Sequence, residues 1–416
     1  MVGKEVEAKE AGQRRIEFNF PLLSIRTKMF SGVFDKLGSL PLSRLIGSIG
    51  LIIVPIVAAI GLYLLYSSLI ALLWTPGVSE AVGEISPASY LLLPGINPLL
   101  PIVYGWLAII CAIAVHEGAH GIIARNRGLN VKSSGLLFFL IIPIGAFVDV
   151  DEDEIAKAKA KDSLRVMAAG VAGNVVVAAA CLLALLVILN GLTPVVNGVY
   201  VSTVVEGMPA EAAGLLPEDV FVSINDVPIA NFDELEAFLN TTSAGDTIQV
   251  TVARGTSWQE QYSTSVTLTE STETTGKAVM GVLVGNLATQ ERLTFYLNPT
   301  LETFSIYLVF PSLRPSLVPF SDPLISFYTH ELGAQWHVYS NIFFWLWFVN
   351  INVAVFNALP IYPLDGGRIF NITLKSALGK KLSEKTITRI TAIVTATIIW
   401  LFAMIILIPY MIKYIL

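Results

Sequence analysis

His116, Glu117 and His120 form a short pattern that suits metal-assisted hydrolysis. Residues four apart on an α-helix are neighbours on one face, so both imidazoles can offer a nitrogen to one zinc ion. Glu117 projects beside this pair, where its carboxylate can act as general base on a water whose pKa the metal lowers to about 7. The same pattern also suits an ordinary solvated or capped helix end. The surrounding residues have to decide between these two interpretations.

A zinc site of this kind needs at least one further protein ligand and an open position for water. Asp365 is the best candidate. It follows an apolar run that ends in two prolines, Pro360 and Pro363, and it precedes a pair of glycines. Proline and glycine interrupt helices, and irregular backbone at membrane depth is tolerated where it lines a cavity, so this break can direct a carboxylate inward. The alternative is a plain turn before the glycines.

The composition indicates an integral membrane protein. Of the 416 residues, 54% are hydrophobic and only 14% are charged, whereas soluble domains have about 25% charged residues. Apolar stretches long enough to cross a hydrocarbon core of about 30 Å cover residues 46–75, 101–124, 164–191, 338–363 and 387–416. The second stretch leads directly into His116. Ionisable groups at membrane depth are expensive and are usually functional, which favours the zinc hydrolase.

The Lys and Arg residues predict the orientation, because cytoplasmic loops are enriched in them. Segments 1–45, 125–165 and 366–389 carry 21 of the 26 such residues. We therefore expect a multi-pass protein of the cell membrane, with the N-terminus in the cytoplasm and residues 192–337 outside. The first apolar run is too long for a cleavable signal peptide and is expected to stay as an anchor. The formal net charge of -6 gives no sign of nucleic-acid binding.

The chain resembles the site-2 protease family of intramembrane zinc metalloproteases. The two hallmark motifs of that family, HExxH and a distant LDG, match residues 116–120 and 364–366. The longer match at residues 357–367 is more specific than HExxH. The resemblance implies a catalytic glutamate, Glu117, and three ligands for Zn2+, which are His116, His120 and Asp365.

Two more segments are similar to parts of that family. Residues 165–174 are rich in small side chains that permit close helix packing, and they end in Asn174. The resemblance implies that Asn174 and Asn357 line the cleft and hold the substrate backbone or the developing oxyanion, with plain helix packing as the alternative. Residues 133–150 are too interrupted for a span. We expect a membrane-associated β-hairpin there, which could add a strand to an unwound substrate.

Residues 195–286 are expected to form a soluble α+β domain outside the membrane. Alternating stretches at 199–205 and 247–252 predict strands, and a helix is expected near 232–239. The run at 207–215, with a Pro-led helix start and a closing glycine, resembles a PDZ domain. Such domains bind a peptide C-terminus by strand addition. The matching candidate loop consists of Gly198, Val199, Tyr200 and Val201; the alternative is a lid that only restricts access.

The remaining segments complete the domain plan. The N-terminal arm is expected to be an amphipathic stretch on anionic lipid or partly disordered. Cys111 and Cys181 fall in predicted spans and should pack rather than pair, and His330, Glu331 and His337 lack the spacing of HExxH and should be surface residues. The plan is an arm at 1–45, a first span at 46–75, a first part of the catalytic core at 101–191, a PDZ-like domain at 195–286, an exterior or interfacial segment at 287–337, and a second part of the core with the last span at 338–416.

The sequence thus predicts a polytopic α-helical membrane protein with about five spans, a β-hairpin and an inserted domain. We expect an intramembrane zinc metalloendopeptidase that cleaves transmembrane substrates already trimmed by another protease. A substrate helix must first unwind, because its amides are shielded by intrahelical hydrogen bonds. Two alternatives remain. One is an inactive membrane PDZ scaffold or chaperone, and the other is an unrelated membrane metallopeptidase with a distant glutamate in place of Asp365.

Overall fold

The computed structural model divides the chain into two compact units. The helical unit comprises Met1–Leu182 and Phe344–Leu416, and the sheet unit comprises Leu183–Phe343. The structure describes residues 16–28, 30–140, 142–255, 258–271, 277–287, 293, 297–300, 304–313 and 318–414.

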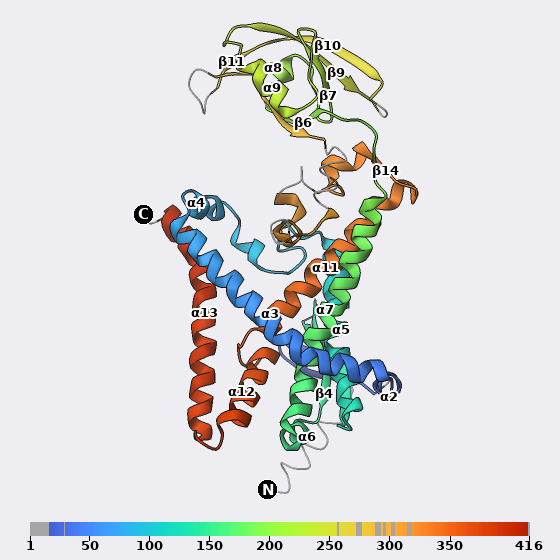
Figure 1. The fold of residues 1–416 in the computed structure, drawn as a ribbon, viewed down its shortest axis with the longest axis vertical. Helices are drawn as coiled ribbons and strands as arrows, with labels where there is room; N and C mark the ends of the chain where they lie inside the picture. The colour runs from blue at the N-terminus through green and yellow to red at the C-terminus, as the bar shows by residue number, and fades with distance from the viewer. Residues whose placement is uncertain are drawn as a thin grey trace. The chain divides into compact units, whose positions relative to one another are not determined.

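Within the described residues, five helices are long and apolar enough to span a membrane, which confirms the number expected from composition. They can be followed in Figure 1 from α3 in blue to α13 in red. Pro41 occupies the first turn of the first of these helices, where its missing amide is no loss. The fourth ends at Ala358 and not at 363, because Pro360 cannot continue it. The five helices are α3 (Pro41–Trp74), α5 (Ile102–Asn126), α7 (Ala160–Asn190), α11 (Trp336–Ala358) and α13 (Glu384–Tyr414).

Shorter helices flank these spans. One of them, α6, begins in an acidic stretch, where the Asp151 side chain accepts hydrogen bonds from the amides of Asp153 and Glu154. The Lys132 ammonium lies 3.0 Å from Asp151 and holds the pKa of that carboxyl below its ordinary value. The short helices of the helical unit are α2 (Ser31–Gly38), α4 (Val78–Gly83), η1 (Pro87–Tyr90), α6 (Glu152–Lys157) and α12 (Asp365–Leu378).

The helical unit also contains an antiparallel sheet with the strand order β1-β2-β3-β4. The predicted hairpin is confirmed as β3 and β4. Two strands of the predicted arm, β1 and β2, extend this hairpin, which the sequence did not predict. Helix α2 of the arm is amphipathic, with Phe34 and Gly38 buried. Residues 1–15 lie outside the described residues, and the contact of the arm with anionic lipid stays a prediction. The partner of β2 is β3, which is distant in the chain, so no local pattern reveals the pairing. The strands are β1 (Ile16–Asn19), β2 (Leu22–Thr27), β3 (Val131–Phe139) and β4 (Ile142–Val150).

Small residues bring the spans of the helical unit together. A Cβ at Gly47 of α3 would lie 3.3 Å from the Ile123 side chain of α5, and one at Gly50 would lie 3.2 Å from Ala168 of α7. Such positions let helix backbones approach closely. The helices α3, α7 and α11 share a buried cluster of small apolar side chains, namely Val54, Val57, Ala168, Val171, Ala354 and Ala358. The elements that carry the site are thereby held in one bundle.

The sheet unit is built on a sheet with the strand order β10-β9-β7-β6-β13, to which β8 pairs through β7. Side chains from both strands and helix share one core, as Val199, Val250 and Leu235 illustrate. This is the predicted α+β domain, which we call the PDZ-like domain after the resemblance of its sequence. Its elements are β6 (Val199–Val204), α8 (Pro209–Ala212), β7 (Val220–Ile224), β8 (Val227–Pro228), α9 (Phe232–Leu239), β9 (Thr247–Arg254), β10 (Glu260–Thr267) and β13 (Val282–Asn286).

The remaining elements of the sheet unit are short. His330 lies among them, and its Nε2 donates to the carbonyl of Ile188 at 2.9 Å while its Nδ1 accepts from the amide of Leu332 at 2.8 Å. Both ring nitrogens therefore form hydrogen bonds, and the one from Nε2 connects this segment to the end of α7. The short elements are β5 (Thr193–Pro194) paired with β14 (Tyr328–Thr329), β11 (Thr269–Glu270) paired with β12 (Ala278–Val279), and the turns η2 (Phe304–Leu308), η3 (Pro311–Leu313), η5 (Asp322–Phe327) and η6 (Gly333–Gln335).

Candidate metal centre

Helix α5 carries the first part of the site. His116 and His120 project from consecutive turns, with ring centroids 4.9 Å apart and ring planes at 80°. Both are buried, with 7% and 8% of their surface exposed. Imidazoles are costly to bury in an apolar bundle unless their nitrogens have partners. The partners of these four nitrogens therefore define what the site can do.

Asp365 enters the site from the first turn of α12. Between α11 and α12 the chain turns sharply, and a Cβ at Gly366 would collide with the carbonyl oxygens of Ala358 and Leu359. One at Gly367 would collide with the backbone of Ile361 and Tyr362. The glycine pair is therefore required for this close approach. The break that the sequence predicts after the fourth span does bring the carboxylate to the histidines.

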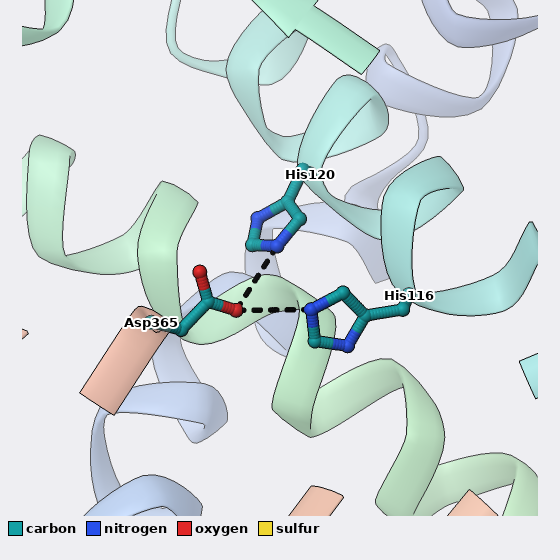
Figure 2. A group of neighbouring side chains, drawn as sticks. All are labelled: His116, His120 and Asp365. Carbon is teal, nitrogen blue, oxygen red and sulfur yellow. Dashed lines mark ion pairs between the residues drawn. The ribbon is translucent and has the colours of Figure 1, made fainter. Parts of the chain in front are cut away.

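The three predicted ligands converge, as Figure 2 shows. Asp365 Oδ2 lies 3.1 Å from Nε2 of His116 and 3.1 Å from Nε2 of His120. One ligand atom from each residue lies within 4.8 Å of the other two, and among the described residues this is the one group of His, Cys, Asp or Glu that meets this criterion. Residues almost 250 positions apart in the sequence thus present two nitrogens and one oxygen to a common point.

Hydrogen bonds fix which nitrogen each histidine presents. His116 Nδ1 lies 2.7 Å from Asn174 Oδ1, and His120 Nδ1 lies 2.7 Å from the carbonyl oxygen of Val166. The Asn174 amide is oriented by its Nδ2, which donates to the carbonyl of Ala112. Since a carbonyl only accepts, both histidines carry their proton on Nδ1. Both Nε2 lone pairs therefore face Asp365.

The donor set fits a zinc ion. With the protons on Nδ1, the two Nε2 lone pairs and the buried Asp365 Oδ2 converge without a hydrogen between them, and Asp365 Oδ2 has no hydrogen-bond partner. A single zinc cation placed between them would satisfy all three acceptors at once. Two imidazoles and one carboxylate are the ligand types of catalytic zinc sites, and three protein ligands leave a position for water or substrate.

Two contributors to the site could not be identified from the sequence. Asn350 of α11 is fully buried and accepts from Asn174 Nδ2 at 2.8 Å, while its own Nδ2 donates to the carbonyl of Leu346. Gly170 of α7 lies against both rings, since a Cβ there would be 2.5 Å from His120 Nε2 and 2.6 Å from His116 Nε2. Any side chain at this position would occupy the point at which the ligands meet.

Glu117 lies next to the metal ligands and contacts the sheet. Its Oε2 accepts a hydrogen bond from the backbone amide of Val148 at 3.0 Å. Val148 belongs to β4, the outer strand of its sheet, so this amide is available on the side away from β3. The general base expected from the sequence is thus held between the histidine helix and the free edge of a strand.

The two asparagines predicted in the cleft differ in position. Asn174 is completely buried and bonds His116, Ala112 and Asn350, so its observed contacts orient a ligand. Asn357 is partly exposed near the end of α11, and its Nδ2 donates to the carbonyl of Val353 in its own helix. Neither observation tests a contact with substrate. Both asparagines keep that role as a prediction only.

The predicted peptide-binding loop of the PDZ-like domain is wrong. Gly198 precedes β6, and Val199, Tyr200 and Val201 lie inside that strand with at most 1% of their surface exposed. Strand β6 pairs with β13 on one side and with β7 on the other, so it has no free edge for a peptide. The free edge beside it belongs to β13, the last strand of the domain. The pairing of β13 with β6 decides which strand is outermost, and the local sequence pattern does not reveal that pairing.

Other candidate groups carry no metal chemistry in the described part of the chain. Cys111 and Cys181 are both free, and Cys181 is buried, as expected for packing. His330 uses its nitrogens in backbone hydrogen bonds, and Glu331 is exposed. Burial raises the pKa of the Tyr307 hydroxyl well above its ordinary value, so this group stays neutral. The chemistry is therefore concentrated at the centre formed by α5 and α12.

Comparisons with known proteins agree with this assignment. The sequence model of Peptidase family M50 matches residues 104–401, which include all four predicted catalytic and ligand residues. An uncharacterized protein of Methanocaldococcus jannaschii is 25% identical over 83% of this chain and 76% of its own length. A protein of Nostoc sp. provisionally named a zinc metalloprotease is 25% identical over 66% of this chain and 85% of its own length.

Two further similarities were found. A membrane-bound transcription factor site-2 protease homolog of Arabidopsis thaliana is 27% identical over 54% of this chain and 41% of its own length. The crystal structure of the PDZ domain of an SdrC-like protein from Listeria monocytogenes covers 21% of this chain and 88% of that domain, with 21% identity and a TM-score of 0.19.

Proposed function

The chain belongs to Peptidase family M50, and we propose that it hydrolyses peptide bonds in or near the transmembrane segments of other membrane proteins. It is a multi-pass, site-2-type zinc metalloprotease. The observation that carries the proposal is the position of the centre. His116 and His120 lie within a candidate span, and Asp365 reaches them from the break that follows another.

Each residue of the centre has a proposed role in the reaction. When bound, zinc supplies a Lewis acid that polarises the scissile carbonyl and lowers the pKa of water. His116, His120 and Asp365 hold that ion. Glu117 takes the proton from the attacking water and gives it to the leaving amine, which requires the carboxylate to stay close to both. Its hydrogen bond from Val148 keeps it beside the histidines.

We propose that the substrate docks along the free edge of β4. A transmembrane helix shields its own amides, so it has to become extended before attack. An extended segment can pair with an outer strand through main-chain hydrogen bonds. Strand β4 is the outer strand next to Glu117, which supports its role in presenting the scissile bond to the general base.

The proposed orientation follows from the Lys and Arg residues. It places the N-terminus and the metal centre toward the cytoplasm and the PDZ-like domain outside. In this arrangement the protein acts in the cell membrane on a transmembrane substrate that another protease has already shortened outside. The PDZ-like domain is then positioned to restrict access or to bind a new peptide C-terminus.

Mapping the cleaved bond tests the proposal. The full-length protein would be reconstituted with single-span substrates carrying either a complete or a shortened outer domain, and products would be identified by mass spectrometry. We expect cleavage inside or next to the span of the shortened substrates, with Glu117→Gln as the inactive control. Cleavage confined to soluble loops, or no cleavage of a broad panel by zinc-loaded protein, would argue for a different function.

A further inference from the structure

Three arginines meet at one end of the helical bundle. Arg44 lies near the start of α3, Arg127 directly follows α5, and Arg165 lies near the start of α7. All three positions are at ends of candidate spans. Ends of spans lie near the membrane–water interface, so we expect the cluster at the level of lipid phosphates in either orientation of the chain. We call these residues the arginine cluster.

The arginine cluster has too few anionic partners. A single carboxylate oxygen, Asp162 Oδ1, lies 3.0 Å from Arg165 Nη1 and 3.7 Å from Arg127 Nη1. The side chains of Arg165 and Arg127 are only 16% and 19% exposed. Their Nε atoms are buried and have no hydrogen-bond partner. Buried guanidinium groups are normally paired, so donors of this kind indicate a missing acceptor.

The local charge also indicates a missing anionic partner. Arg127 and Arg165 share one carboxylate, and burial together with the charge of Arg165 lowers the pKa of Arg127 below its ordinary value. Arg44 adds to this repulsion. The long helix α3 also begins here, without an acidic residue in its first turn and without a side-chain cap. Its free amides add positive potential.

We propose that Arg44, Arg127 and Arg165 bind the phosphate group of an anionic ligand at the membrane surface. Guanidinium groups offer paired N–H donors that match phosphate oxygens. Basic pockets between spans bind lipid headgroups in this way. An anionic phospholipid and a soluble phosphate share this chemistry. Arg127 lies seven residues beyond His120, which corresponds to about 10 Å along the axis of α5. A bound ligand would therefore stabilise the end of the helix that carries the histidines.

Ligand binding to the full-length, zinc-loaded protein in neutral detergent tests this site. The readout is the shift in unfolding temperature with short-chain phosphatidylglycerol, short-chain phosphatidylcholine or inorganic phosphate. We expect phosphatidylglycerol to stabilise the wild type most. Each arginine is expected to supply about one charge contact to the lipid. The double variant with Arg127→Gln and Arg165→Gln should therefore bind phosphatidylglycerol about 30-fold more weakly. Arg44→Gln alone should weaken this binding by about fivefold. Arg44 is exposed, so its replacement should not impair folding.

Two variants separate a binding site from a structural cluster. Asp162→Asn removes the competing carboxylate and should tighten phosphatidylglycerol binding. Arg389→Gln removes an exposed arginine near the start of α13 and should leave phosphatidylglycerol binding unchanged. If inorganic phosphate alone reproduces the full shift, the site stands and its ligand is soluble. If neither ligand stabilises the wild type, or if all variants respond as the wild type does, the proposal is overturned.

Discussion

The two histidines of the centre are held by partners of different kinds. His116 bonds to the side chain of Asn174, whereas His120 bonds to the main-chain carbonyl of Val166. A main-chain carbonyl is present whatever the residue, but the Asn174 amide has to be oriented by others. Ala112 and Asn350 provide that orientation. The position of His116 Nε2 is therefore the one that depends on a relay of side chains.

Asn350→Ala should weaken zinc binding by about tenfold, because partners behind a metal ligand typically contribute 10- to 100-fold to affinity. The variant leaves Asn174 with one fewer acceptor while the ligands themselves stay intact. Competition with a chelator measures the change. Asn352→Ala is the matched control, since Asn352 is in the same helix but donates only to the carbonyl of Phe348 in its own helix. Equal zinc affinity in the two variants would show that Asn350 does not orient His116 through Asn174.

Gly170→Ala should weaken zinc binding by about tenfold or more. The new methyl group would lie 2.5 Å from His120 Nε2, so the rings would have to move apart. Overpacking of this kind costs about 1–3 kcal/mol, which corresponds to a loss of roughly tenfold or more in affinity. Metal analysis after gel filtration gives the result. At Gly173 a methyl group would meet Ala119 and Val115 and not the histidines, so Gly173→Ala should retain zinc.

The proposed ligands could be predicted from the sequence, but their supporting residues could not. His116, Glu117 and His120 share one helical turn, and Asp365 follows a visible break in an apolar run. Gly170, by contrast, looks like any small packing residue. Its function depends on which face of α7 meets α5, and that is decided by the packing of the whole bundle. The same holds for Asn350 and Val148.

At the level of elements, the sheet of the helical unit connects the proposed docking strand for the substrate to Glu117, the proposed general base. Strand β2 pairs with β3 and carries β1 on its other side, whereas β4 pairs only with β3 and is an outer strand. One amide of β4, that of Val148, bonds to Glu117. A hairpin alone would be marginally stable in water, and two further strands make it a firmer platform. The N-terminal strands thus contribute indirectly to the position of the catalytic carboxylate.

Val148→Pro should reduce cleavage by about 10- to 100-fold without loss of zinc, because it removes the amide that holds Glu117. Proline is tolerated on an outer strand when its missing donor faces away from the sheet. Val148→Ala keeps the amide and should behave as the wild type. Single-turnover cleavage and zinc content are measured together. Full activity of the proline variant would show that this hydrogen bond does not position the base.

Local patterns predicted some elements and missed others. The five spans and the β3–β4 hairpin could be predicted, because hydropathy and turn residues are local signals. Strands β1, β2 and the outer position of β13 could not. The β1–β2 pair is held in place by the pairing of β2 with β3, and β13 pairs with β6. Both of these partners are remote in the sequence, and period-two alternation does not identify the partner.

At the scale of the molecule, the PDZ-like domain is inserted between α7 and α11. Its first and last strands are neighbours, with Val199 opposite Asn286 in the β6–β13 pairing. The ends of the insertion are therefore about 5 Å apart. The buried core of the domain is formed by its own residues, and the helical unit is a separate compact body. The insertion should thus be removable without loss of the metal centre.

Replacing residues 199–286 by a Gly/Ser linker of about four residues should leave zinc content unchanged and remove the preference for shortened substrates. The reason is that the metal ligands all lie in the helical unit, whereas the proposed restriction of access lies in the insertion. Cleavage rates of substrates with complete and shortened outer domains give the answer. A preference that survives the replacement would exclude the domain as the filter.

We propose that one zinc centre, made by His116, His120 and Asp365 and served by Glu117, carries the hydrolysis. The most direct measurement is zinc content and cleavage of a transmembrane substrate by the wild type, Glu117→Gln and Asp365→Ala. We expect about one zinc per chain in the wild type, zinc without cleavage in Glu117→Gln, and neither in Asp365→Ala. Cleavage that survives Glu117→Gln, or full zinc content and activity in Asp365→Ala, would contradict the account.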